Sequence, residues 1–143
     1  MLTIDTDDFR LQMAPVSARR EKPGGPYLEW IDVRIRLTEP GLQAEGQWRV
    51  MPAELRNFQQ QLQSMQTQLR PAQRAELKGV EPGFALILRM LEQGAILGEW
   101  RFQPLPPDGA SITGFCGLDQ SFLPELLRGI ESLLAFPGTG NPA

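Results

Sequence analysis

The sequence of 143 residues contains no histidine and a single cysteine, and both shortages exclude classes of chemistry. Histidine is the one side chain whose unperturbed pKa lies in the physiological range, and it is the commonest metal ligand. Without it, serine and cysteine catalytic triads and most zinc sites lose their central member. The one cysteine, Cys116, cannot form an internal disulfide, and its apolar neighbours indicate a buried side chain rather than a reactive thiolate.

The sequence also lacks an excess of positive charge and any long apolar run. It has 14 basic and 17 acidic residues, a net charge of −3, which argues against a nucleic-acid-binding protein. No stretch approaches the roughly 18 apolar residues that a membrane span needs. Residues 1–8 include acidic side chains, unlike a signal peptide. We therefore expect a cytoplasmic protein with neither nucleic acid nor a membrane as a partner.

Carboxylates are the remaining means of acid–base catalysis, and their spacing does not favour it. Asp7 and Asp8 are adjacent, so on an extended chain they point in opposite directions, and Glu29 and Asp32 also diverge. No glycine-rich loop links a strand to a helix as phosphate binding requires. We expect no catalytic residues, cofactor or metal. A hydrolase with two carboxylates brought together from distant positions is the less favoured alternative.

Alternating apolar and polar residues predict strands in the first half of the chain. An opening strand is expected over residues 9–13, followed by a loop over residues 15–26. The clearest strand covers residues 27–37, and Pro40-Gly41 forms a turn into a second strand over residues 42–50. These last two strands predict an antiparallel hairpin with one dry and one solvated face.

The second half is predicted to contain three more strands. Residues 84–91 form an almost continuous apolar run of strand length, bounded by turn residues. Residues 96–102 alternate and complete another hairpin, and a short strand follows around residues 111–116.

Two helices are expected, over residues 52–70 and 121–136. Pro52 suits the first turn of a helix, and apolar residues from Leu55 to Leu69 recur every three or four positions. This stripe is expected to pack onto the sheet, and a self-associating seam is the alternative. Ser121 is the expected N-cap of the last helix, with Pro124 in its first turn.

These elements predict an α+β two-layer sandwich. An antiparallel sheet of about six or seven strands would carry both helices on one face. Residues 1–143 are expected to form one domain, with flexible ends over residues 1–7 and 138–143.

The solvated sheet face is the candidate interaction surface. Opposite charges paired across strands would explain it as a soluble surface alone. The alternative is a partner-docking surface, since arginine makes geometrically specific contacts and tryptophan is a common anchor. Besides Glu45, the residues that alternation places on this face are Trp30, Asp32, Arg34, Arg36, Arg49, Glu99 and Arg101.

Three segments carry a family resemblance: the strand Tyr27–Val33, the helix start at Glu54-Leu55 with Phe58 and Leu62, and the run Leu118–Leu123 that opens the last helix. Together they resemble a family of small bacterial proteins, the WapI-type immunity proteins. The last run is similar to the family's Asp-Gln-Ser-aromatic-Leu helix start. The resemblance spans residues 27–136, and its motifs are structural rather than catalytic.

The resemblance implies a non-enzymatic protein-binding domain that neutralises a bacterial toxin by occluding it. The partner would be a cognate toxin, and the chain a monomer or a homodimer. A self-associating structural module of unknown role is the alternative function.

Overall fold

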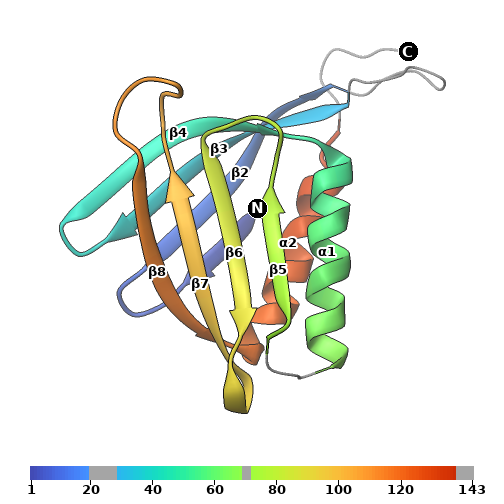
Figure 1. Ribbon diagram of the computed structural model, residues 1–143. Coiled ribbons are helices and arrows are strands. Elements are labelled where there is room, and N and C mark those ends of the chain that lie inside the picture. The colour runs from blue at the N-terminus through green and yellow to red at the C-terminus, as the bar shows by residue number, and fades with distance from the viewer. Residues whose placement is uncertain (20–28, 69–71, 138–143) are drawn as a thin grey trace.

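The computed structural model describes residues 1–19, 29–68 and 72–137, which form two antiparallel four-stranded sheets and two helices (Figure 1). Sheet A has the strand order β1-β2-β3-β4, and sheet B has the order β5-β6-β7-β8. The elements in chain order are β1 (Leu2–Asp5), β2 (Arg10–Arg19), β3 (Trp30–Glu39), β4 (Leu42–Val50), α1 (Pro52–Thr67), β5 (Arg74–Lys78), β6 (Phe84–Met90), β7 (Ala95–Phe102), β8 (Ile112–Asp119) and α2 (Leu123–Leu134).

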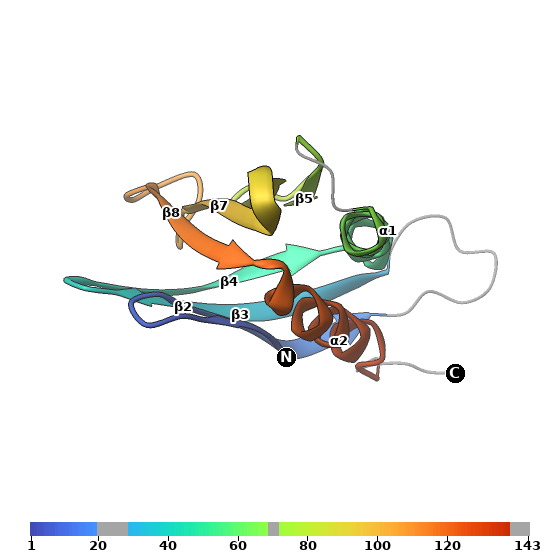
Figure 2. The same cartoon turned by 90° about the horizontal axis from the view of Figure 1, so that it is seen from below.

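The two sheets lie in separate layers and cover each other's apolar faces (Figure 2). In β3, the residues of one parity, from Ile31 to Leu37, are fully buried, and their neighbours point to solvent. Aromatic rings join the layers: the ring centroids of Trp48 and Phe84 are 5.3 Å apart, and those of Phe9 and Trp100 are 5.9 Å apart. The core therefore sits between the sheets, where each dry face removes the other from water.

The helices lie along the side of the sandwich where β1 and β5 are the edge strands. α1 packs along β5, α2 packs along β1, and the two helices contact each other (Figure 2). Gly129 allows the close approach of α2, since a Cβ there would lie 2.7 Å from the Cα of Leu2. β4 and β8 are the edge strands on the opposite side. No helix in the described part of the chain is both long and apolar enough to cross a membrane.

The apolar stripe of α1 is buried in the core of the molecule. Leu55, Phe58, Leu62 and Met65 are fully buried, and the glutamines between them cover the outer surface. The prediction that the stripe packs onto the sheet is confirmed for these four residues, since α1 packs along β5, so they offer no seam for self-association. α1 ends at Thr67, three residues before the predicted end, and residues 69–71 lie outside the described residues.

The α+β class, the antiparallel strands and the two helices are confirmed. The count of six or seven strands was approximate, because eight strands are present in the described residues and they form two sheets rather than one. β1 and β5 were not predicted, since they have only 4 and 5 residues and two buried positions each. β1 lies within residues 1–7, for which a flexible end was expected, and it pairs with β2.

The loop predicted from residue 15 is wrong up to Arg19, because β2 continues through Pro15. The pairing of β2 with β3 shifts register between Pro15 and Ser17. Such a bulge accommodates a proline, which has no N–H for the ladder. Residues 20–28, with the first two positions of the predicted strand 27–37, lie outside the described residues, and β3 extends to Glu39.

The start of the last helix also differs from the prediction, which placed the N-cap at Ser121. A 3₁₀ turn over Gln120–Phe122 comes first, and α2 begins only at Leu123. Asp119 caps this turn by accepting a hydrogen bond of 2.8 Å from the backbone N–H of Ser121. The contacts with Ser121, first the side-chain and then the backbone hydrogen bond, lower the pKa of Asp119. An aspartate two residues upstream thus takes the capping role expected of the serine.

Candidate protein-binding surface

The outer face of sheet A holds most of the predicted surface residues. Trp30, Asp32, Arg34 and Arg36 alternate along β3 with the buried core residues, and Arg49 lies opposite Asp32 on β4. Cross-strand neighbours share a face of a sheet. The structure therefore brings these five residues together on one side of the molecule.

Glu99 and Arg101 lie elsewhere, on β7 and on the outer face of sheet B. There they line a hollow of about 310 Å³ beside Phe115, which is 64% exposed. The apolar faces of the two sheets meet in the core, so their outer faces point in opposite directions. The sequence predicted one solvated face, but these residues lie on two faces, one on each sheet. Alternation shows which residues of a strand share a side, and it does not show how the strands are divided between sheets.

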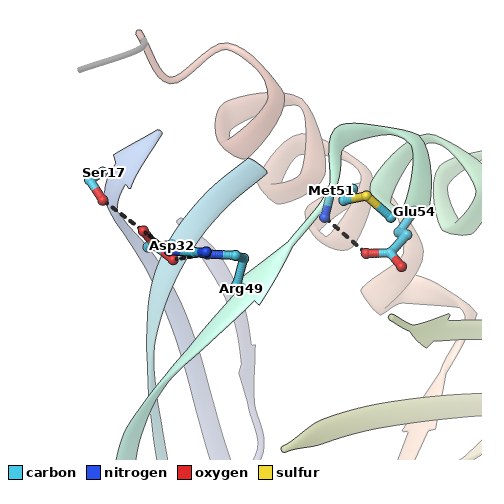
Figure 3. Close-up of polar contacts among 5 residues, drawn as sticks. All are labelled: Ser17, Asp32, Arg49, Met51 and Glu54. Atoms are coloured by element: carbon cyan, nitrogen blue, oxygen red, sulfur yellow. Dashed lines mark hydrogen bonds and ion pairs between the residues drawn. The ribbon is translucent and has the colours of Figure 1, made fainter. Parts of the chain in front are cut away.

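Asp32 is the centre of a polar network on the sheet A face (Figure 3). Arg49 donates to it from Nε at 2.9 Å and from Nη2 at 3.5 Å, and Ser17 Oγ donates from β2 at 3.0 Å. The hydrogen bond with Asp32 raises the pKa of Arg49 above its ordinary value, although partial burial opposes this effect. The network connects three strands and fixes the direction of the Arg49 guanidinium group.

Trp30 lies beside two of the arginines. The guanidinium carbon of Arg49 is 4.4 Å from the centre of its ring, and that of Arg19 is 5.2 Å away. Arg19 is the cross-strand partner of Trp30 on β2, whereas Arg49 approaches from β4. Both distances are within the range of a cation–π interaction. The half-buried indole is therefore contacted by one guanidinium group from each of the two strands that flank β3.

A second group of charges follows Trp30 and Asp32 along the same strands. Glu45 on β4 forms ion pairs with both Arg34, whose Nε lies 3.6 Å from the carboxylate, and Arg36, whose Nε lies 3.3 Å from it. All three side chains are about half exposed, so each ion pair contributes little stability. One carboxylate therefore serves two guanidinium groups, and the local charge stays positive.

The sheet A face as a whole is basic on an acidic protein. Its described residues include five arginines and three carboxylates, and the remaining residues of the chain carry a net charge of −5, since the chain total is −3. The arginines are Arg10, Arg19, Arg34, Arg36 and Arg49, and the carboxylates are Asp5, Asp32 and Glu45.

Sequence reasoning missed Arg10, Ser17 and Arg19 as members of this face. The predicted loop from Pro15 removed Ser17 and Arg19 from the strand pattern. The bulge shifts the parity of β2 by one residue, which returns both side chains to the outer face. If alternation is counted separately on each side of Pro15, it places Ser17 and Arg19 on the outer face.

Metal-binding side chains do not gather in the described residues. No group of three or more Cys, Asp or Glu residues there could hold a metal ion. Cys116 is 6% exposed, and burial raises its pKa to about 11. Its sulfur therefore stays a neutral thiol near neutral pH.

The fold and the charged sheet face together define an α+β domain whose candidate site is a protein-binding surface. A comparison with protein families matches residues 1–137 to the immunity protein WapI-like family. The chain belongs to this family, as the resemblance of its strand and helix motifs had indicated. A search of curated proteins finds no match.

Proposed function

We propose that this chain is an immunity protein that binds a cognate toxin and neutralises it by occlusion. The observation that carries the proposal is the family match, which covers all but the last six residues. An immunity protein of this kind needs a binding surface and no catalytic residues of its own. The absence of histidine in the sequence agrees with that requirement.

The outer face of sheet A is the surface proposed to contact the toxin. Strands lie about 4.8 Å apart and rise about 3.3 Å per residue, so three strands of about nine residues cover roughly 400 Å² in projection. Side chains raise the accessible area above this projection. It is then of the same order as the ~800 Å² that each partner contributes to a standard interface. One sheet face is therefore large enough to bind and cover a toxin site.

Co-expression tests this function directly. A candidate toxin domain, taken from the genes that flank the gene for this chain, is expressed in a sensitive bacterial host, with and without the chain. We expect growth to be restored by the chain and the two proteins to elute as one complex in size-exclusion chromatography. A toxin that still arrests growth and elutes separately would show that the proposed function is wrong.

A double variant tests the surface. Trp30→Ala with Arg34→Ala removes the aromatic anchor and one arginine, neither of which is part of the buried core. We expect a folded protein, checked by circular dichroism, that no longer restores growth. The matched control is Lys78→Ala with Arg101→Ala, two exposed residues on sheet B. Protection by the Trp30 variant, or its loss in the control, would place the binding site elsewhere.

A further inference from the structure

Resting on that function, we propose that the partner surface bound by sheet A is an acidic protein surface, with carboxylates around a recess that receives Trp30. The proposal concerns the chemistry of the partner, which neither the family nor the function specifies. It stands on the charge of the face, the geometry around Trp30 and the fixed direction of Arg49.

The arginines of the face are incompletely neutralised. Arg34 and Arg36 share one carboxylate, that of Glu45. Arg19 contacts the ring of Trp30 and has no ion pair with a carboxylate in the described residues. A partner that supplies carboxylates at these positions would gain bidentate contacts with guanidinium groups. A basic partner would meet repulsion from the same groups.

Trp30 is already held in place before a partner binds. Contacts with Arg19 and Arg49 restrict its ring, and the residue is still partly exposed. An aromatic side chain that is ordered in the free protein loses less entropy on binding, and tryptophan and arginine are enriched among the residues that dominate interface energy. The start of β3 therefore presents a preorganised anchor between two guanidinium groups, at one end of the charged face.

Asp32 extends this preorganisation to Arg49. Its two oxygens accept from Arg49 and from Ser17, so the carboxylate is engaged from β2 and β4 at once. The side chain of Arg49 is 45% exposed, so this guanidinium group can meet a partner while Asp32 holds it. Asp32 is thus a positioning residue, and Arg49 is a contact residue.

A protein fits this face better than a nucleic acid does. Three carboxylates lie among the arginines and would repel a phosphate backbone. Guanidinium groups already lie against the Trp30 ring, where a nucleobase would have to stack. A protein can place its acidic side chains between the carboxylates, which a regular backbone of phosphates cannot do.

Calorimetric titration of the full chain with the purified toxin domain tests the charge of the partner. We expect affinity to fall at least tenfold between about 50 and about 300 mM salt, as for complementary charged surfaces. Arg34→Gln with Arg36→Gln should weaken binding about tenfold at low salt and flatten the salt dependence. Lys78→Gln with Arg101→Gln makes the same change in net charge on sheet B, and its affinity should stay within about twofold of the wild type.

NMR locates the contact on the same samples. The chain has three tryptophans, and Trp48 and Trp100 are only 3% and 2% exposed, so the indole N–H signal of Trp30 reports the sheet A face. We expect the toxin domain to shift this signal and a short single-stranded thymidine oligonucleotide to leave it unchanged. Melting curves by circular dichroism confirm that each variant is folded before its affinity is interpreted.

The outcomes separate the two proposals. Toxin binding that is insensitive to salt and to the Arg34 and Arg36 changes would overturn the acidic partner and leave the immunity function in place. Equal loss in the sheet B control would do the same. A Trp30 signal shifted by the oligonucleotide, with competition against the toxin, would replace the protein partner with a nucleic acid. A wild-type chain that neither binds nor protects would contradict both proposals.

Discussion

Asp32 is the residue on which the polar contacts of the sheet A face converge. Its side chain is 24% exposed and accepts hydrogen bonds from Ser17 and Arg49. Partial exposure limits the energy of each contact, because water competes for the same groups. The value of this network lies in the orientation of Arg49 more than in the stability of the fold.

The Asp32→Asn variant should therefore change the stability of the fold little and the orientation of the Arg49 side chain more. We expect the free energy of unfolding to fall by about 1 kcal/mol, the cost of weakening a charged hydrogen bond at a partly exposed site. Urea denaturation measures this change. Glu45→Gln, at a carboxylate that is half exposed, is the control and should stay within about 0.5 kcal/mol of the wild type. A loss of several kcal/mol in Asp32→Asn would show that the network supports the core instead.

Cys116 provides a second test at a single side chain. Since burial raises its pKa from 9.0 to about 11, we expect almost no reaction with a thiol reagent at pH 8 in the native protein and rapid reaction in urea. The folded state favours the neutral thiol. This contribution to stability is complete below pH 9 and is lost as the pH rises through about 11. Rapid labelling of the native protein at pH 8 would contradict a buried, neutral thiol.

The two helices are fixed in place by different devices. α1 buries its apolar stripe, and Glu54 accepts a hydrogen bond at its start from the backbone N–H of Met51 (Figure 3). Across a loop, Glu54 also accepts one from the backbone N–H of Val80. α2 approaches β1 so closely that a single Cβ would not fit at Gly129. The position of α1 thus depends on burial and capping, and the position of α2 depends on the absence of a side chain.

The Gly129→Ala variant has two opposing effects on stability. Alanine has the higher helix propensity, but its Cβ would clash with the backbone near β1. Alanine favours a helix over glycine by about 1 kcal/mol, whereas overpacking costs about 1–3 kcal/mol. The new Cβ would lie 2.7 Å from the Cα of Leu2 and 3.1 Å from the backbone oxygen of Met1, so the backbone itself must move. We expect a net loss of about 1–2 kcal/mol in the free energy of unfolding, measured by urea denaturation.

Gly117→Ala, on β8, is the control for this variant. Apart from its neighbours in the chain, a Cβ added at Gly117 would meet no atom of the described residues within 4 Å. The stability of this variant should match the wild type within about 0.5 kcal/mol. An increase in stability in Gly129→Ala would show that α2 can shift away from β1 at little cost.

The elements differ in how far the sequence could predict them. β3 and β4 were predicted because their alternation is long and their turn has a clear proline and glycine signal. β1 and β5 are too short to produce a period, and they are held by partners that are distant in the sequence. Arg19 was missed because Pro15 resembles the end of a strand when the bulge is not known. Glu99 and Arg101 lie on a different face from the arginines of β3 because the two sheets stack against each other. No local sequence pattern contains this information.

The whole molecule depends on one shared core, since the inner faces of both sheets and the helices form a single buried cluster. Phe84 on β6 contacts Trp48 of sheet A and Phe102 of sheet B, with ring centroids 5.3 and 6.3 Å apart. In the described residues, the apolar face of each sheet is covered by the other sheet together with the helices. The expected single domain should therefore unfold as one unit.

We predict one cooperative transition in urea, with the same midpoint by circular dichroism and by tryptophan fluorescence. Trp100→Phe leaves only the two tryptophans of sheet A, and Trp30→Phe with Trp48→Phe leaves only Trp100 of sheet B. Within each variant, circular dichroism and fluorescence should give the same midpoint. Phe84→Ala should lower the free energy of unfolding by about 3–5 kcal/mol without dividing the transition, because the lost contacts belong to both sheets. Two separate midpoints would show that the sheets are independent units.

The placement of both helices beside β1 and β5 has a consequence for the handling of the protein at high concentration. It leaves β4 and β8 as the edges on the opposite side, and an uncovered edge strand is a template for pairing with another chain. β4 carries Glu45 and Arg49, whose charges oppose such pairing, whereas β8 presents glycines and the exposed Phe115. We therefore expect β8 to be the more aggregation-prone edge, and Phe115→Lys to delay precipitation during storage, as measured by light scattering.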